Sequence, residues 1–551
     1  MILGAVFERE TLVIPRTRGL AIARGVAAAT LLGIIATSWL VLTGSQTVTT
    51  VGDAARFGAA LMRLLAPLQL TLAMLASTLV AVLAVGMEKD RRTLELLLVS
   101  SLGEPQLVLG KLGGSLLRVG LLLVTAAPLF VLASLFGGVT GSQLTRLFVV
   151  TAAAAAAAAS IATAAAFWRD TTFQAIAITG AALVAWVAAG EATAAFAGPA
   201  AAGIVSPARA AFDALTPEGG RGLAMFLALC GGLVTVSSGL AVALVRRWNT
   251  ATEVRRPRAA HVTLKRREVW ANPVFWREVC TRAHGRAMIV VRLAWIALFA
   301  VAVAGLAAEA RAPVPDRFAV AAAIVPMMLA SILAVAALAV TAVTSERDRG
   351  TLDLLLVSDL EPREFVWGKL LGVMVAAREI VILPLAVGMA LVPLGLATAE
   401  EAAYLVAGLA VLEFFAAVLG VYAGLSHSLS RRAIGVTLGI VTFLSLGVAT
   451  AMRIMVAFGG SFELQLAPFL AVIVGGGVGL YAALSARNPS PAVAWASALL
   501  PTLTFVAITG FLQGSTLQVF LVVVAAYGFA TLALLIPSIA AFDLLTGRSG
   551  H

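Results

Sequence analysis

The chain has 551 residues, of which 61% are hydrophobic and only 12% are charged. Soluble globular proteins have about a quarter of their residues charged, so this composition excludes a soluble enzyme, a disordered protein and a nucleic-acid-binding domain. The net charge of +11 therefore needs a membrane explanation, and the usual one is that basic residues collect in the cytoplasmic loops of membrane proteins.

Apolar runs that are long enough to cross a bilayer recur from residue 20 almost to the C-terminus. We expect them to be α-helices, because a backbone in lipid must satisfy its hydrogen bonds internally. Six runs precede a basic segment at 246–286 and eight follow it, which gives 12–14 spans with a best count of 14. The predicted spans are residues 20–42, 64–86, 112–136, 144–167, 173–196, 223–245, 288–306, 318–343, 370–396, 402–425, 434–458, 466–484, 492–512 and 517–539.

The basic residues predict the orientation of these spans. The loops around Lys89, Arg347 and Arg431 fall on the same side as the basic segment, whereas the opposite loops balance their basic residues with acidic ones. The positive-inside bias places this side, with both termini, in the cytoplasm. The sequence therefore predicts an all-α, multi-pass protein of the inner (plasma) membrane.

Residues 88–112 recur at 346–370, and 15 of the 25 positions are identical at an offset of 258. A second match, at an offset of 268, relates Phe7-Glu8-Arg9-Glu10 to Phe275-Trp276-Arg277-Glu278. This pattern predicts a tandem duplication with a first half at 1–248, a basic cytoplasmic linker at 249–272 and a second half at 273–551. Six spans separate the copies, an even number, so the halves run parallel.

Each copy of the repeat joins the second and third spans of its half. Thr93 or Thr351 can begin a helix, and strong helix formers follow. Leu94, Leu97 and Leu98 would share one face of that helix. We expect a short amphipathic helix at the inner membrane surface. The alternative is an ordinary charged loop, which the presence of two similar copies makes less favourable.

The pattern Glu-basic-x-x-Gly-Thr-Leu-x-Leu-Leu-Leu-x-Ser followed by Gly-Lys resembles the signature of ABC-2 type ABC transporter permeases. The Phe-x-Arg-Glu segments resemble the elbow helix of that family. The resemblance implies two fused permease halves, each with an elbow helix and six spans, or up to eight in the second half. It also implies that the repeated loops carry coupling helices, which dock separate ATPase (nucleotide-binding) subunits, one beneath each half. ATP and Mg would bind those partner chains, with no cofactor held by this chain.

Carried over position by position, the resemblance implies two groups of site residues. The residues that couple to the ATPase subunits are Glu88, Asp90, Arg91, Thr93, Leu97, Gly110 and Lys111, with Glu346, Asp348, Arg349, Gly350, Thr351, Leu355, Gly368 and Lys369. The elbow residues are Phe7, Arg9, Glu10, Phe275, Arg277 and Glu278. Arg92 stands where the family usually has glycine.

The resemblance fits less well beyond residue 458. Either an extra hairpin or a re-entrant helix would account for the additional runs of the second half. The Ser-Pro-Ala sequences at 206–208 and 490–492 look equivalent, yet the predicted topology places them on opposite sides of the membrane.

Charged residues within the spans are functional candidates, because each costs about 2.5–3.5 kcal/mol at a helix centre. The candidates are Glu191, Arg378, Glu379 and Glu413. Arg378 and Glu379, like Arg118, lie near enough to the cytoplasmic end to reach water. Glu413 lies midway along its span, and we expect it to pair with an arginine; a direct role with substrate is the alternative.

The run at 152–159 consists entirely of alanine, which is a small residue. Such a face would let another helix approach closely. Alanine-rich low complexity is the alternative.

Several kinds of chemistry find no support in the sequence. The two cysteines and four histidines are scattered, which excludes a disulfide framework and a metal site built on them. No Gly-x-x-x-x-Gly-Lys-Ser/Thr loop occurs, so the chain has no P-loop of its own. We expect no catalytic residue, no metal and no nucleic-acid partner.

Together these features predict the transmembrane permease subunit of an ATP-driven ABC exporter. It would couple ATP hydrolysis on its partners to translocation of a substrate that the sequence does not identify. The alternative is an ion-coupled secondary transporter with internal repeats, although such proteins often have inverted repeats. A membrane-embedded transferase lacks supporting residues.

Overall fold

The computed structural model describes residues 4–16, 18–45, 50–90, 93–169, 172–217, 222–249, 270–280, 288–311, 317–348, 350–452, 462–487 and 489–546. Every regular element in these ranges is a helix, as expected from the composition. Arg91, Arg92, Arg349 and residues 250–269 of the predicted linker lie outside the described residues.

We refer to α1–α10 as the N-terminal half. Its elements are α1 (Gly4–Val13), η1 (Ile14–Arg16), α2 (Arg18–Ser45), α3 (Val51–Asp90), α4 (Thr93–Val99), α5 (Glu104–Ser134), α6 (Gly141–Trp168), α7 (Thr172–Ala197), α8 (Pro199–Val205), α9 (Pro207–Ala214) and α10 (Leu223–Trp248).

We refer to α11–α23 as the C-terminal half. Its elements are α11 (Pro273–Cys280), α12 (Met288–Glu309), α13 (Arg317–Asp348), α14 (Thr351–Val357), α15 (Pro362–Ala376), α16 (Arg378–Ala390), α17 (Ala399–Ser426), α18 (Ser430–Thr442), the π-helical turn η2 (Phe443–Gly447), α20 (Phe462–Leu484), α21 (Pro491–Leu512), α22 (Thr516–Ala540) and α23 (Phe542–Thr546).

Among the described residues, 11 helices are long and apolar enough to cross a membrane, or 12 if the bent pair α15 and α16 is one span. The chain is therefore a multi-pass membrane protein. The best sequence count of 14 also includes α12 and α20, which are 22 and 23 residues long but whose apolar stretches among the described residues are the shorter Arg292–Ala307 and Val472–Leu484. The predicted span at 370–396 is divided by a 61° bend between α15 and α16.

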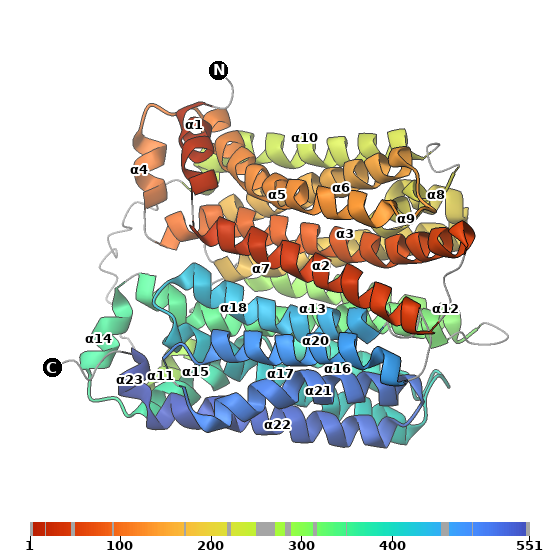
Figure 1. Cartoon of the computed structure of the whole chain (residues 1–551). Helices are drawn as coiled ribbons and strands as arrows, with labels where there is room; N and C mark the ends of the chain where they lie inside the picture. The colour runs from red at the N-terminus through yellow and green to blue at the C-terminus, as the bar shows by residue number, and fades with distance from the viewer. Residues whose placement is uncertain are drawn as a thin grey trace.

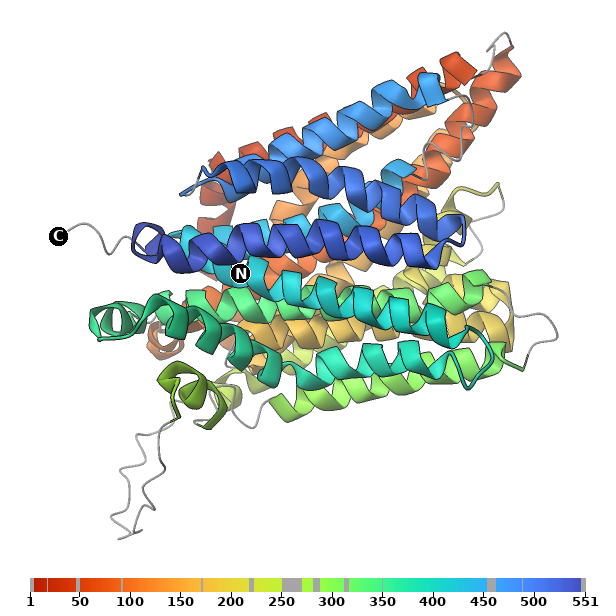
Figure 2. The same ribbon diagram turned by 90° about the horizontal axis from the view of Figure 1, so that it is seen from below.

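The long helices run side by side, with the N-terminal half above the C-terminal half in Figure 1. Figure 2 shows the same bundle from below. The short helices α1, α4, α11, α14 and α23 gather at one end, which we call the α4/α14 end, whereas α8 and α9 lie at the other (Figure 1). The halves meet where α7 packs against α12 and α13, and where α2 packs against α20.

The boundaries of several helices in the two halves differ by 258 residues, the offset of the sequence repeat. α4 and α14 share this offset at both ends, as do α6 and α17. α6 packs against α3 and α10, and α17 packs against α13 and α22. α22 thus occupies in its half the place that α10 occupies in the other.

The C-terminal half contains an extra hairpin. α20 and α21 pack against each other, and α21 packs against α22, whereas the N-terminal half has the short helices α8 and α9 at this point of the chain. The two Ser-Pro-Ala sequences begin α9 and α21. They lie at opposite ends of the bundle, because Arg487, just before α21, donates a 2.6 Å hydrogen bond to the carbonyl of Leu545 in α23.

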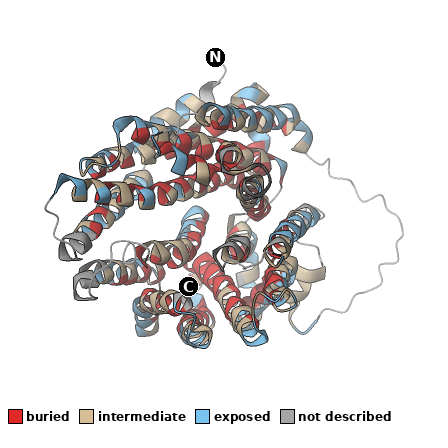
Figure 3. Ribbon diagram, turned by 90° about the vertical axis from the view of Figure 1, so that its right-hand side faces the viewer, coloured by how far each residue is buried: buried red, intermediate tan, exposed pale blue. Residues whose placement is uncertain are grey.

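Buried residues face the neighbouring helices and exposed ones lie on the outside of the bundle (Figure 3). The alanine run of α6 follows this rule, since Ala154, Ala157, Ala158 and Ala159 are fully buried. Beside them, Ser237 of α10 donates a 2.8 Å hydrogen bond to Ser160 of α6. The expectation that this face lets other helices approach closely is confirmed.

In α17, Gly420 lets a neighbouring helix approach closely, as the alanines do in α6. A Cβ atom at Gly420 would lie 2.6 Å from the Cβ of Ala339 and 2.8 Å from the carbonyl oxygen of Ala336, both in α13. Real Cβ atoms are not found at such distances, so the two helices can cross this closely only with glycine at this position.

We predict that Gly420→Ala lowers the stability of the bundle by about 1–3 kcal/mol, the usual effect of overpacking a close contact. Gly408→Ala is the matched control in the same helix, because no atom lies within 4 Å of its Cβ position. Thermal unfolding of both variants in detergent measures the difference. Equal melting temperatures would show that the helices can separate at no cost.

Candidate functional site

α4 and α14 begin in the same way. Thr93 is the first residue of α4, and its hydroxyl donates a 3.2 Å hydrogen bond to the carbonyl of Glu88 at the end of α3. Thr351 donates an equivalent bond of 3.1 Å to the carbonyl of Glu346. Gly350 precedes α14 with a φ of 69°, in the left-handed region that favours glycine. Each threonine therefore fixes its short helix to the long helix before it.

One face of each short helix packs on the bundle. Leu94 and Leu352 are buried, while Leu97 and Leu355 are partly buried against the same apolar core. α4 rests on α3, and α14 rests on α13. The predicted shared leucine face is confirmed, and it is turned toward the protein's own helices.

The opposite face of each short helix is apolar and exposed. Leu96 and Val99 of α4 are 72% and 88% exposed, and Leu354 and Val357 of α14 are 73% and 86% exposed. These four residues, which we call the exposed pairs, occupy equivalent places in the repeat. These residues were not among the predicted site residues, which included only the leucines of the opposite face, although each exposed pair is spaced i, i+3 and thus shares a face.

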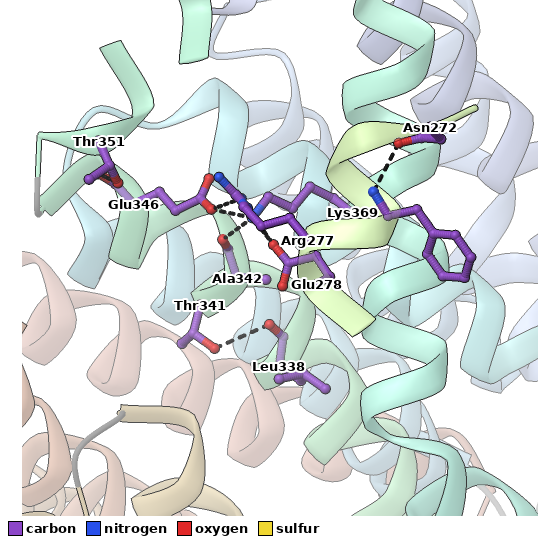
Figure 4. Close-up of polar contacts among 10 residues, drawn as sticks. Asn272, Arg277, Glu278, Leu338, Thr341, Ala342, Glu346, Thr351 and Lys369 are labelled. Atoms are coloured by element: carbon purple, nitrogen blue, oxygen red, sulfur yellow. Dashed lines mark hydrogen bonds and ion pairs between the residues drawn. The ribbon is translucent and has the colours of Figure 1, made fainter. Parts of the chain in front are cut away.

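The second copy of the repeat and its elbow segment form one ion cluster (Figure 4). Lys369 in α15 is 1% exposed, and its Nζ lies 2.7 Å from Glu278 in α11 and 2.6 Å from Glu346 in α13. Nζ also donates a 3.1 Å hydrogen bond to the carbonyl of Ala342. Arg277 pairs with Glu278 at 3.1 Å and with Glu346. The cluster joins three helices with two cations and two carboxylates.

The first copy forms a related cluster. Lys111 in α5 pairs with Glu88 of α3, and its Nζ lies 4.0 Å from Glu10 of α1. Arg118 of α5 pairs with the same Glu10 at 3.1 Å. Arg9, the counterpart of Arg277, is exposed. The structure thus brings together coupling and elbow residues that the sequence analysis had placed in two separate groups.

Small residues let the elbow helices reach these lysines. The Cβ position of Gly372 lies 2.7 Å from the Cβ of Glu278, and that of Gly114 lies 3.1 Å from the Cγ of Glu10. Gly368 meets the Cβ of Val274 at 2.7 Å. Gly114 and Gly372 were not among the predicted site residues, although the pattern Gly-Lys-Leu-x-Gly in both copies is a signal for them.

The remaining predicted residues of this group lie around the two clusters. Gly110 is buried in α5 and Phe7 is half-buried in α1. The backbone N–H of Phe275 donates to Asn272 Oδ1 at 2.9 Å, which caps the start of α11. The side chain of Asp90 lies outside the described residues.

Another basic pair repeats at the same offset. Lys89 Nζ donates hydrogen bonds of 2.6 and 2.9 Å to the carbonyls of Phe167 and Arg169 at the end of α6. Arg347 donates to the carbonyls of Leu425, at 3.3 Å, and His427 at the end of α17. Cations stabilise the carbonyl ends of helices, so these residues tie the second membrane helix of each half to the fourth.

A cavity of about 120 Å³ lies beside the C-terminal cluster, between the halves. Its wall includes Met87, Thr172 and Phe173 from the N-terminal half. Arg277, Glu346, Asp348 and Ser430 contribute from the C-terminal half.

Charge and burial act in opposite directions on Glu278. Burial raises the pKa of this carboxyl, but the Lys369 ammonium and the Arg277 guanidinium outweigh it and hold the pKa below its ordinary value. The carboxylate is therefore the form that the folded protein stabilises.

Glu413 in α17 has a different partner from the one that we expected. Ser331 of α13 donates a 2.8 Å hydrogen bond to its Oε1, and Oε2 has no hydrogen-bond partner among the described residues. The expected pairing with an arginine is wrong, because the basic residues of α13 lie only in its first and last turns. Glu413 is fully buried.

The other charged candidates have ionic partners. Glu379 lies 2.9 Å from Arg378 and 3.2 Å from Arg292. Arg378 is also half exposed. The side chain of Glu191 lies outside the described residues.

The arrangement at the α4/α14 end offers two exposed apolar surfaces, each on a short helix backed by buried ion pairs. Within the described ranges, no three His, Cys, Asp or Glu side chains gather in a way that could hold a metal ion. No family model and no curated protein sequence matches this chain.

We predict that Lys369→Met destabilises the protein by about 3–5 kcal/mol, because it removes the buried one of the two cations that the carboxylates of Glu278 and Glu346 share. Arg363→Met is the control, since Arg363 pairs with Glu361 in an exposed place where ion pairs contribute little. Chemical unfolding of purified protein in detergent compares them. Equal effects of the two substitutions would contradict a structural role for the buried cluster.

The depressed pKa of Glu278 predicts a stability that depends on pH. A carboxyl with a lowered folded-state pKa contributes its stability above its ordinary value of 4.5 and loses it as the pH falls below that value. The melting temperature of the wild type should therefore decrease on acidification through this window. Glu278→Gln should flatten that decrease. An unchanged pH profile in the variant would contradict the assignment.

Proposed function

We propose that this chain is the transmembrane permease subunit of an ATP-driven exporter of the ABC-2 type, with two permease halves fused in tandem. The α4/α14 end faces the cytoplasm of a cell bounded by the inner membrane. Separate ATPase subunits bind there, one on α4 and one on α14. They drive substrate export by closing on ATP.

The exposed pairs of α4 and α14 are the single observation that carries this proposal. Aliphatic side chains that are 72–88% exposed at the end of a membrane bundle are unfavourable in water. Two such surfaces, at equivalent positions of a repeat and at the same end of the bundle, fit a partner that binds twice.

The ion clusters support the proposal in a second way. α4 and α14 are attached to α3 and α13, whose ends carry the carboxylates of Glu88 and Glu346. Lys111 and Lys369 join these carboxylates to α5 and α15. A displacement of α4 would therefore be transmitted through these contacts to α3 and α5, and a displacement of α14 to α13 and α15.

The same contacts decide which substitution tests docking. Reversing the charge of Glu88 or Glu346 would break internal ion pairs, so it would not report on a partner alone. Substitutions in the exposed pairs leave the clusters intact.

We predict that Leu96→Asp combined with Leu354→Asp lowers the affinity for the ATPase subunits at least about tenfold, because a carboxylate placed in an apolar contact stays unpaired. Leu12→Asp is the matched control, since Leu12 is an exposed leucine of α1 at the same end. The measurement is co-purification of a P-loop ATPase from native membranes. The proposal fails if the double variant retains as much ATPase as the control.

A further inference from the structure

The two halves connect their elbow helices to the membrane helices in different ways. In the N-terminal half, Glu10 of α1 is joined to α5, by Arg118 at 3.1 Å and more loosely by Lys111 at 4.0 Å. In the C-terminal half, Lys369 and Arg277 join α11 to both α15 and α13.

Arg277 adds to this difference a second bridge between α11 and α13, beside the one that Lys369 makes. Its guanidinium pairs with Glu278 on its own helix and with Glu346 on α13, and a guanidinium can hold two carboxylates at once. Its counterpart Arg9 is exposed. Lys369 and Arg277 therefore both join α11 to α13, whereas α1 is joined to α5, and it is Lys111 of α5 that pairs with Glu88 of α3.

The helices behind the clusters differ as well. α13 packs against α7 of the N-terminal half, so it forms part of the seam between the halves. α3 packs against α5, α6, α7 and α9 of its own half, and it reaches the seam through Leu83 and Met87 in the wall of the cavity. A displacement of α14 reaches the seam through α13 directly, and a displacement of α4 first reaches helices of its own half.

The cavity lies where this movement would act. Glu346 and Arg277 line it from the C-terminal half, and Met87 and Phe173 line it from the N-terminal half. Its volume of about 120 Å³ leaves room for side chains to shift as the halves move.

We propose that the two docking helices are functionally unequal: α14 drives the relative movement of the halves, and Arg277 is the positioning residue that transmits it. α4 serves chiefly as the anchor of its ATPase subunit. This inference rests on the proposed function, because it requires ATPase subunits bound at the α4/α14 end.

The experiment measures movement at the opposite end of the bundle, so it needs no knowledge of the cargo. Spin labels are placed at Ser142→Cys and Glu400→Cys, two exposed positions in the first turns of α6 and α17. The native Cys230 and Cys280 are replaced by alanine. The complex with its co-purified ATPase is then compared without nucleotide and with ATP and vanadate, and the distance between the labels is recorded in each state.

We expect ATP to change the distance between the labels in the parent and to the same extent in Arg9→Gln. Arg277→Gln should lose the change while it retains its ATPase subunits. Arg277→Lys should give an intermediate change, because lysine offers a single ammonium in place of the two-sided guanidinium. A merely structural role would alter the melting temperature without this graded loss.

Two outcomes overturn the inference, and they are distinguishable. If Arg277→Gln binds the ATPase and moves as Arg9→Gln does, the halves are driven equally and the proposed function stands. If no ATPase co-purifies with the parent, the inference and the proposed function fail together. Should Arg277→Gln yield no folded protein, Arg277→Lys against Arg9→Lys provides the same comparison.

Discussion

The burial of a lysine ammonium is the constraint on which the α4/α14 end depends. Lys369 is 1% exposed, and removing such a charge from water costs several kcal/mol unless it is paired in good geometry. Its partners come from α11 and α13, and a third hydrogen bond goes to the carbonyl of Ala342. Because one buried cation needs acceptors from several elements, these helices cannot separate without exposing an unpaired charge to an apolar environment.

Under the proposed function, this constraint is what would let a short helix act on the membrane bundle. α14 has one leucine face packed on α13 and one apolar face exposed, so its position follows that of α13. A partner that binds the exposed face would therefore act on the ion cluster and not on a loose loop. In the N-terminal half, Lys111 and Glu88 provide the corresponding link between α3 and α5.

Close helix packing provides the rest of the rigidity. Alanine in α6 and Gly420 in α17 let each of these helices approach its neighbours closely, and dispersion contacts between closely packed helices are the main attraction within a membrane. Lys89 and Arg347 then fix the ends of α6 and α17 to the second membrane helix of each half. Each half thus has a closely packed interior, and at the α4/α14 end basic side chains hold its helices together.

The helical class, most of the membrane helices and the place of the short helices α4 and α14 follow from the sequence alone. Apolar runs and repeated motifs are local, so they can be read along the chain. The sequence did not predict that Glu10 lies in an ion cluster with Lys111, and Glu278 in another with Lys369; the folded structure shows both. It also replaced the expected arginine partner of Glu413 with Ser331, and it divided the predicted span at 370–396 by a bend. These outcomes depend on contacts between side chains of helices that are far apart in the chain. No local sequence pattern specifies such contacts.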